Sequence, residues 1–345
     1  MAREVSAITG AQLCPPKWTN AAVSIQDKLK VTIENSELCG RFAGRVIRGV
    51  NPQAKTPDCI VKRLSRAGQR SISALVDISN YAMLAIGQPT HVFDLQKIKG
   101  DLTVRWGREG EELELLNGQT VSVAPLNGQG VGVIADANGV ESVAGIMGGN
   151  PSSVTLDTQD IYLESAFWWP TAIQGRARRF NFSTDAAHRF ERGVDPASTV
   201  DALEFVSGLL SQICGGQLGP VDDQVINMPK RADVRLRVAR AQKVIGVPLT
   251  ADGIAGLFDR IGLQYQREGD EAFVVKAPSY RFDIEIEEDL IEEVARLYGF
   301  ENIPANPPVA EQRMQGTNEP RRGIHKLRHA IAARGYQEVL NFGFI

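Results

Sequence analysis

The feature that most constrains the fold is a β-rich stretch, residues 102–167, with helical patterns on both sides of it. It contains alternating or wholly apolar runs, such as LTVRW and DIYLESAF, which predict half-buried and fully buried strands. Two of its turns are Asn117-Gly118 and Asn138-Gly139, and Asn-Gly between apolar runs is the strongest short signal for a β-hairpin. We therefore expect a mixed α/β domain built around hairpins.

Helices are predicted before and after these strands. A first helix begins at Thr56–Asp58, where a threonine N-cap is followed by proline at the first helical position. A second covers residues 72–86 and is apolar on most sides, so we expect it to be buried. One more starts at Pro170, and another covers residues 195–215. Strands and helices together predict one α/β domain over residues 38–218.

A second pattern starts after the linker GPVDDQVINMPKRA. A strand and helix (VRLRVARAQKVIGVPL), a helix (ADGIAGLFDRIG), a hairpin (LQYQREGDEAFVVKAP) and an acidic helix (EEDLIEEVARLYGF) follow one another. This content is compatible with a small winged-helix-like domain over residues 219–304. Beyond it, RRGIHKLRHAIAARG predicts an amphipathic helix, and GYQEVLNFGFI predicts a strand that stops at Ile345. We therefore expect the sequence to be part of a longer protein.

Composition narrows the class of protein. The chain has 345 residues, of which 43% are hydrophobic and 23% charged, and its net charge is −3. Such a chain is expected to be globular and cytoplasmic, since it has neither an apolar run of about 20 residues nor a secretory signal. Its four cysteines form no CxxC pair. Binding to nucleic acid would need a local basic patch, for which GRARRF is a candidate.

His91 raises the first question about a site. It lies in GQPTHVFD, directly after the predicted helix 72–86, with Gly87 as the expected C-cap and Pro89 preventing further helix. Functional residues often lie at helix ends, and so do ordinary turn histidines. The local residues alone leave both alternatives open.

The segment DIEIEEDLIEE is a second candidate site because it carries seven carboxylates. The four that can converge at one end of the predicted helix are Asp283, Asp289, Glu292 and Glu293. Hard cations such as Mg²⁺ bind converging oxygen ligands of this kind. The alternative is a solvated acidic face with Arg281 and Arg296 as partners.

Three longer segments together resemble a known family. GQPTHVFDLQKIKG, ESAFWWPTAIQGRARRFNFSTDAAHRFERGVDP and SYRFDIEIEEDLIEEVARLYGFENIP closely resemble, in order and spacing, the β subunit of bacterial phenylalanine–tRNA ligase. The resemblance covers nearly the whole chain. It implies the end of a tRNA-binding-like domain and a linker at 1–37, an editing domain at 38–218, a small domain with the acidic helix at 219–304, and a truncated catalytic-like domain at 305–345.

The resemblance also implies a function. The family's editing domain hydrolyses tyrosyl-tRNA that was mischarged in place of phenylalanyl-tRNA. Tyrosine differs from phenylalanine by one hydroxyl, which a pocket shaped for phenylalanine rejects by only about 10² in rate. A second site therefore needs a buried acceptor for that hydroxyl. By resemblance, Glu164 is this acceptor and His91 orients the attacking water or acts as a weak base. We take these two as the catalytic pair.

Further positions match the family's site by resemblance. The residues expected to bind substrate are Arg70, Gly148, Thr184 and Ala186. Asp283, Asp289, Glu292 and Glu293 match ligands of a Mg²⁺ ion. Where the family pattern has AFF, this chain has Ala166-Phe167-Trp168-Trp169. We expect the larger Trp168 to narrow or reshape the nearby wall, which changes details of the rim and not the function.

The implied partners are tRNA(Phe) and an α subunit, in an α2β2 assembly. ATP would be bound by the α subunit, which carries the aminoacylating site. Two alternatives stay open at this point. The first is a non-catalytic scaffold that binds tRNA and the α subunit, and the second is a stand-alone Mg²⁺-dependent hydrolase. A test of whether the chain hydrolyses tyrosyl-tRNA with Glu164-dependent selectivity distinguishes these alternatives from the editing function.

Overall fold

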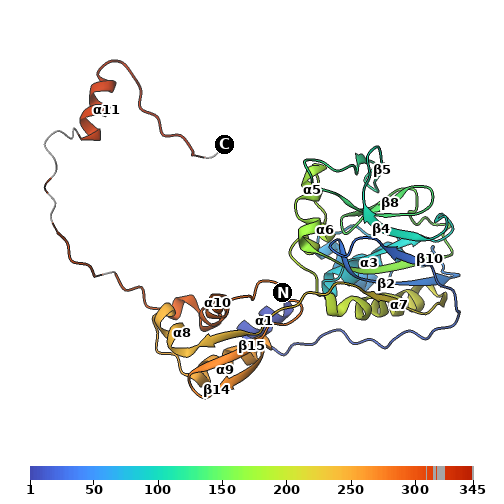
Figure 1. The fold of residues 1–345 in the computed structure, drawn as a ribbon, viewed down its shortest axis with the longest axis horizontal. Coiled ribbons are helices and arrows are strands. Elements are labelled where there is room, and N and C mark those ends of the chain that lie inside the picture. Colours follow the sequence, from blue (N-terminus) through green and yellow to red (C-terminus); the bar gives the residue numbers. More distant parts are fainter. Residues whose placement is uncertain (308, 314–315, 317–322, 344–345) are drawn as a thin grey trace. The chain divides into compact units, whose positions relative to one another are not determined.

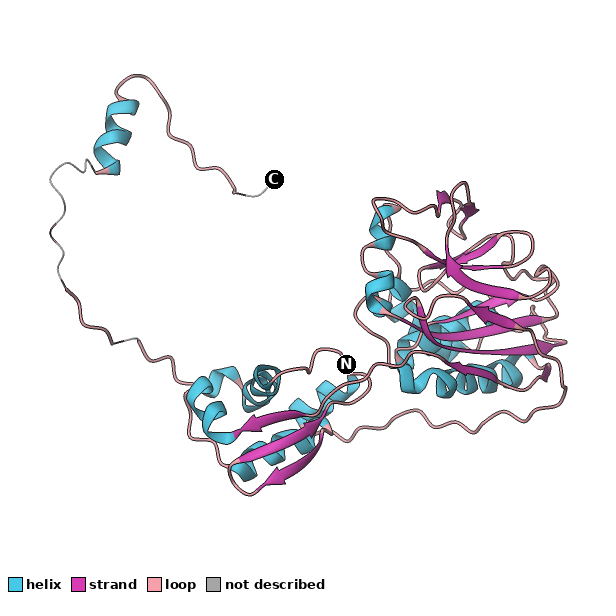
Figure 2. Ribbon diagram, in the orientation of Figure 1, coloured by secondary structure: helices cyan, strands magenta, loops and turns pink. Residues whose placement is uncertain are grey.

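The computed structural model describes residues 1–307, 309–313, 316 and 323–343. The chain divides into two compact units, Met1–Ile303 and Pro304–Ile345. The first unit contains three buried apolar clusters. Figures 1 and 2 show its helices and strands.

Two five-stranded sheets form the part of the first unit that carries the predicted editing domain. The first sheet has the order β1 (Val31–Ile33), β4 (Leu102–Trp106), β7 (Gly132–Ala135), β8 (Val140–Val143), β9 (Met147–Gly148). The second has the order β11 (Gln217–Leu218), β2 (Cys39–Arg48), β10 (Ile161–Trp168), β3 (Thr90–Asp94), and β12 (Asp222–Val225) also pairs with β2. A separate hairpin joins β5 (Glu112–Glu114) to β6 (Thr120–Ser122).

The second sheet is buried on both faces. Phe42 and Val46 of β2 pack in the cluster shared with the first sheet, whereas Ala43 and Ile47 pack in the cluster shared with helices. This alternation follows from the two-residue period of a strand. The covering helices are α3 (Ala74–Ile86) and α7 (Thr199–Cys214), and α2 (Asp58–Arg66) packs on α3. Figure 1 shows α7 on the side of β2 and β10 that faces away from β4 and β8.

Both Asn-Gly predictions are confirmed. Asn117-Gly118 joins the paired strands β5 and β6, and Asn138-Gly139 joins β7 and β8. Gly118 has φ 81°, a left-handed conformation that glycine adopts without a steric penalty. The prediction of a mixed α/β fold is confirmed as well, and the structure shows that its strands form several sheets.

Two helix starts were predicted slightly too early, for one physical reason. Helix α2 begins at Asp58, and Thr56 does not cap it because the Thr56 hydroxyl donates to the carboxylate of Asp77 (2.6 Å). Helix α3 begins at Ala74, since the backbone N–H of Ile72 donates to the same carboxylate (2.8 Å). Asp77 is fully buried, so these donors satisfy a carboxylate that would otherwise be costly to bury.

The segment after β10 is broken into short helices. They are α4 (Pro170–Ile173), α5 (Arg176–Arg179), α6 (Asp185–Phe190) and the 3₁₀ turn η1 (Pro196–Ser198). The helix predicted for residues 195–215 is therefore two elements, η1 and α7. The predicted start at Pro170 is confirmed.

Residues 234–303 form a smaller sheet with helices around a separate apolar cluster. The sheet has the order β13 (Val234–Arg237), β15 (Ala272–Lys276), β14 (Gln264–Glu268). Its helices are α8 (Val238–Ile245), α9 (Ala251–Ile261), α10 (Glu287–Tyr298) and the 3₁₀ turn η2 (Phe300–Asn302), and α1 (Ala2–Thr9) packs on α9. The predicted hairpin and acidic helix are confirmed as β14–β15 and α10.

The second unit contains one described helix, α11 (Ile324–Ala332), which confirms the predicted amphipathic helix. The strand predicted at the end of the chain is wrong for its described part, because residues 335–343 are exposed and pair with no described strand. The last two residues of that prediction lie outside the described residues. No helix in the described part of the chain combines the length and apolar character needed to cross a membrane.

A buried ion pair joins the second sheet to its helical cover. Arg45 of β2 is 2% exposed and donates two hydrogen bonds to Glu204 of α7 (2.9 and 3.2 Å). Glu204 also accepts a bond from the backbone N–H of Ala21 (3.0 Å), so the same carboxylate holds the segment before β1 in place.

Replacing one partner of this pair is expected to destabilise the fold strongly. Glu204→Ala leaves a buried guanidinium unpaired, which costs about 3–5 kcal/mol of unfolding free energy. Asp101→Ala is the control, because the Lys30–Asp101 pair is exposed and such pairs contribute about 0–1 kcal/mol. Urea denaturation of both variants measures the difference. Equal losses would contradict a structural role for the buried pair.

Candidate active site

Glu164 and His91 are brought together by strand pairing. Glu164 lies on β10, His91 lies on β3, and the two are direct partners in the antiparallel register. Phe93, two residues after His91, packs in the cluster between the sheets, and so does Tyr162, two residues before Glu164. The two-residue period therefore directs both side chains into the space between the two sheets.

Both residues border one small cavity. Its lining residues are Pro89, Thr90, His91, Ser142, Val143, Gly145, Ile146, Met147, Gly148, Glu164, Trp168, Ala186 and Phe190. Its volume is about 60 Å³. An apolar cavity of about 150 Å³ holds benzene, so this pocket admits water as it stands and must widen before it can take an aromatic ring.

Burial determines the protonation of both groups. Glu164 is 6% exposed, and burial raises the pKa of its carboxyl to about 8. Burial also lowers the pKa of the His91 imidazole to about 4. At neutral pH the pocket therefore holds an uncharged carboxylic acid opposite an uncharged imidazole. A neutral carboxyl group can both donate and accept a hydrogen bond.

The His91 ring has one nitrogen available. Its Nε2 is buried and has no hydrogen-bond partner. The ring stands edge-on to Phe93, with centroids 4.3 Å apart and planes at 86°. A buried polar atom without a partner is costly, and here it borders a cavity large enough for water. The arrangement suits a ring nitrogen that orients a water molecule.

Gly148 is required by the close approach of His91. A Cβ at position 148 would lie 2.3 Å from Cε1 and 2.8 Å from Nε2 of His91. Gly148 pairs with Ser142 across β8 and β9, so the backbone cannot retreat without disturbing the sheet. Any larger residue must push the imidazole out of its position.

Thr184 and Ala186 take different places at the pocket. Ala186 lines it. Thr184 is the N-cap of α6: its hydroxyl accepts from the N–H of Ala187 (3.0 Å) and donates to the carbonyl of Ile146 (2.9 Å). Thr184 thus fixes the pocket loop to the helix and does not itself line the cavity.

Arg70 is exposed and does not line the cavity. It lies on the loop between α2 and α3. Asp77 holds this loop by accepting from the Ser71 hydroxyl (2.6 Å), and the Gln69 amide donates to the carboxylate of Asp185 in α6. These contacts tie the Arg70 loop to the helix that carries Ala186.

The structure adds pocket residues that sequence reasoning missed. They are chiefly Thr90, Ser142, Met147 and Phe190. Trp168 was expected to reshape the nearby wall, and it is 1% exposed and forms part of that wall. Its spacing from Glu164, four residues along the same strand, was a usable signal for a shared face. The others come from different elements, so only the tertiary fold reveals them.

The four acidic residues of the second candidate site do not converge on a common point. Asp283 and Glu293 both accept hydrogen bonds from Arg281 (2.7 and 2.8 Å), and Glu293 also accepts from Arg296 (2.8 Å). Asp289 accepts from the backbone N–H groups of Glu285 and Ile286 (2.8 Å each) at the start of α10.

The arrangement therefore does not fit a magnesium ion. Glu292 is exposed, and within the described ranges no group of three or more His, Cys, Asp or Glu side chains is placed to share a metal. Two guanidinium groups already neutralise Asp283 and Glu293, which lowers the pKa of Asp283. A Mg²⁺ ion at these residues stays a prediction, and it requires Arg281 to move away from both carboxylates.

Comparison with known proteins gives consistent matches. Residues 38–215 match the model of the B3/4 domain family, and residues 234–300 match that of the tRNA synthetase B5 domain. Phenylalanine–tRNA ligase beta subunits of Ralstonia nicotianae, Cupriavidus pinatubonensis and Burkholderia lata are 63%, 61% and 61% identical over 345, 348 and 345 residues. These matches cover 100% of this chain and 42% of each relative.

Among solved structures, an N-terminal fragment of the phenylalanyl-tRNA synthetase beta subunit from Pyrococcus horikoshii is 16% identical. It matches with a TM-score of 0.40, over 86% of this chain and 81% of the fragment.

The raised pKa of Glu164 predicts a pH-dependent stability. A carboxyl group whose pKa is higher in the folded than in the unfolded chain stabilises the fold at low pH, and this contribution is lost as the pH rises from about 4.5 to about 8. Each pKa unit of difference between the folded and the unfolded carboxyl group changes the free energy of unfolding by about 1.4 kcal/mol. Glu164→Gln cannot ionise, so its unfolding free energy should fall less over this pH range than that of the wild type.

Chemical denaturation at several pH values measures this difference. The control is Glu271→Gln, since Glu271 is exposed and its replacement should leave the wild-type pH profile unchanged. A Glu164→Gln profile that coincides with the wild type would show that Glu164 ionises normally in the folded chain.

Proposed function

Because this chain belongs to the B3/4 domain family, and aligns over its whole length with phenylalanine–tRNA ligase β subunits, we propose that its pocket hydrolyses tyrosyl-tRNA(Phe). The observation that carries the proposal is the pairing of a buried, uncharged Glu164 with a buried, uncharged His91 at one cavity. Water attacks the ester carbonyl carbon, the bond to the ribose oxygen breaks, and free tyrosine and tRNA leave.

Glu164 supplies selectivity for tyrosine. Its surroundings are apolar, with Trp168, Met147 and Phe190 in the wall, so the ring of either amino acid fits chemically. Only tyrosine brings a hydroxyl that can donate to the carbonyl oxygen of the Glu164 carboxyl group. With phenylalanine bound, this buried group has no partner, which costs about 1–3 kcal/mol. That corresponds to a preference of roughly fivefold to 150-fold.

His91 supplies orientation of the nucleophile. With a pKa of about 4 the ring is neutral at pH 7, so its unpartnered Nε2 can accept a hydrogen bond from water when the ring carries its proton on Nδ1. An aminoacyl ester is already reactive, so holding one water near its carbonyl supplies much of the required acceleration. The vicinal ribose hydroxyl is close to the same carbonyl and can take part in proton transfer.

Substrate must open the pocket before it binds. The present cavity of about 60 Å³ is too small for a tyrosyl ring. Met147 is a long, unbranched side chain that adopts new rotamers at low cost, and it is half-buried at the edge of the first sheet. We infer that movement of Met147 and the adjoining loop admits the ring. The small volume is also the observation that favours the alternative function, a non-catalytic scaffold.

The relatives support further proposals about the intact protein. We propose that it binds tRNA(Phe) and a catalytic α subunit in an α2β2 assembly in the cytoplasm, and that ATP is bound by the α subunit. Residues 38–218 would be the editing domain and residues 219–304 a winged-helix-like module for tRNA or α-subunit contact. Residues 1–37 and 305–345 would then belong to neighbouring domains.

Arg70 would meet the 3′ end of the tRNA, since arginine binds phosphate well.

The first test is deacylation of tyrosyl-tRNA(Phe) and phenylalanyl-tRNA(Phe) by the chain. We expect the wild type to hydrolyse the tyrosyl ester preferentially, and Glu164→Ala to lose about tenfold or more of this preference. His91→Ala should slow both esters by about 10²-fold without changing the preference. Glu271→Ala, at an exposed position, is the matched control for folding and charge.

The outcomes separate the two candidate functions. Selective hydrolysis that depends on Glu164 supports the editing function. Tight binding of tRNA without hydrolysis, by a chain with a cooperative unfolding transition, would support the scaffold and exclude a self-contained editing site.

Gly148→Ala tests the geometry at the catalytic histidine. The added Cβ would overlap the His91 ring, so we expect hydrolysis of tyrosyl-tRNA to fall about as far as in His91→Ala, while unfolding free energy falls by about 1–3 kcal/mol. Gly253→Ala is the matched control, because a Cβ there would meet only the Thr250 hydroxyl, at 3.3 Å. Full activity in Gly148→Ala would mean that the ring position of His91 does not matter.

A further inference from the structure

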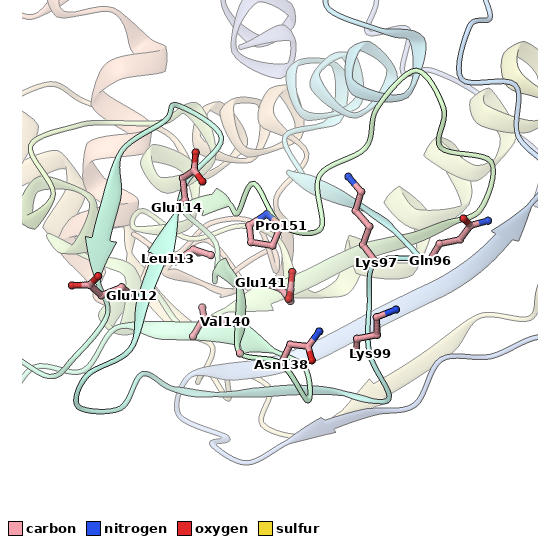
Figure 3. Close-up of a pocket in the computed structure, with 11 residues that line it drawn as sticks. Gln96, Lys97, Lys99, Glu112, Leu113, Glu114, Asn138, Val140, Glu141 and Pro151 are labelled. Atoms are coloured by element: carbon pink, nitrogen blue, oxygen red, sulfur yellow. The ribbon is translucent and has the colours of Figure 1, made fainter.

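A second cavity, larger than the candidate active site, borders strand β8, which also contributes to the lining of that site. Its volume is about 580 Å³. It is bordered by the loop before β4, by β5 and by the turn between β7 and β8 (Figure 3). Glu141 of β8 lines this cavity and Ser142, the next residue, lines the candidate active site. The two-residue period of the strand accounts for this division.

Glu141 is the unusual group in this cavity. It is 4% exposed, and its Oε2 is buried without a hydrogen-bond partner. Burial raises the pKa of its carboxyl group. Within the described part of the chain, no lysine or arginine lies within ion-pair distance of it. A buried carboxylate in this situation gains most from a ligand that brings a positive charge and hydrogen-bond donors.

The opposite wall is positively charged. In Figure 3, Lys97 and Lys99 stand across the cavity from Leu113 and Glu112. Lys97 donates to the carbonyl of Ser153 (2.6 Å) and lies 4.0 Å from the carboxylate of Asp94, and these two contacts fix its ammonium group. Lys99 is exposed, and its backbone N–H donates to Asp136 (2.7 Å) at the β7–β8 turn. The ammonium group of Lys97 is therefore held in place, whereas the exposed side chain of Lys99 can reorient toward an anion.

The other residues that line the cavity limit the kinds of ligand that it can bind. Glu112 and Glu114 add two exposed carboxylates on β5, so a ligand with several negative charges, such as a nucleotide phosphate, is disfavoured by repulsion. A polyamine carries no anionic group that could pair with Lys97 and Lys99. Leu113 and Val140 are buried and supply an apolar surface. Opposite charges on two sides with an apolar surface between them match a small zwitterion.

We propose that this cavity binds a small apolar zwitterion, a free amino acid or a short peptide, with its ammonium group on Glu141 and its carboxylate on Lys97 and Lys99. The site is independent of the editing reaction, because none of these three residues borders the pocket of His91 and Glu164. Glu141, which would hold the ligand, is directly followed in β8 by Ser142, which lines the pocket of His91 and Glu164.

The test is isothermal titration of the full chain with L-leucine and, separately, with the dipeptide leucyl-leucine. Binding of one or the other at millimolar concentration is expected, and the stronger of the two identifies the source of the ligand. Glu141→Gln should weaken binding about tenfold or more, because it removes the charge that holds the ammonium group. Glu164→Gln is the matched control and should bind as the wild type does.

Two further probes test the two ends of the ligand. N-acetyl-leucine lacks the ammonium group and should not bind. Lys99→Met changes an exposed side chain. It should weaken the binding of leucine several-fold and leave the binding of leucinamide, which lacks the carboxylate, unaffected. Lys62→Met, also at an exposed position, should change neither affinity. The proposal is overturned if neither zwitterion binds, if Glu141→Gln and Lys99→Met both leave binding unchanged, or if Glu164→Gln abolishes it.

Discussion

The architecture of the candidate site depends on one strand that is buried on both faces. All eight residues of β10 are buried, with β2 on one side and β3 on the other. Within this strand Glu164 is the one ionisable carboxyl group, and its register partner on β3 is His91. On the other side its partner is Gly44, where a Cβ would overlap the hydroxyl of Tyr162. The pairing therefore fixes what surrounds the carboxyl group.

Buried ionisable side chains of this chain fall into two kinds, uncharged groups and ion-paired groups. At the candidate active site burial keeps Glu164 and His91 uncharged, because among the described residues no oppositely charged side chain pairs with either of them. At Arg45 and Glu204, and at Glu293 with Arg281 and Arg296, burial is accompanied by direct ion pairing. The paired groups hold elements together, whereas the uncharged groups remain available to a ligand. This contrast is the physical basis for regarding the first as a site and the others as structural contacts.

Much of the fold was predictable because its signals are local. The two Asn-Gly hairpins, the strand around Glu164 and the acidic helix follow from short patterns and were found where expected. The start of α2 was misplaced because Asp77, remote from Thr56 in sequence, takes its hydroxyl as a hydrogen-bond donor. No local pattern reports such a contact, since it exists only in the folded chain.

The candidate site was predictable only in part. Residue patterns alone left His91 and Glu164 ambiguous, and the resemblance to a known family singled them out. The resemblance did not predict that Arg70 is exposed. It placed Asp283 and Glu293 on a metal ion, whereas both pair with arginines, as the alternative drawn from the residue pattern had it. These facts depend on packing and on competing side chains.

The most direct test of the central claim is a crystal structure of the chain with an amide-linked tyrosyl-adenosine, which the site cannot hydrolyse as an ester. We expect the phenol hydroxyl within hydrogen-bond distance of the Glu164 carboxyl group, the carbonyl near a water held by His91 Nε2, and a pocket widened by movement of Met147. The ligand bound elsewhere, or with its phenol pointing away from Glu164, would contradict the account.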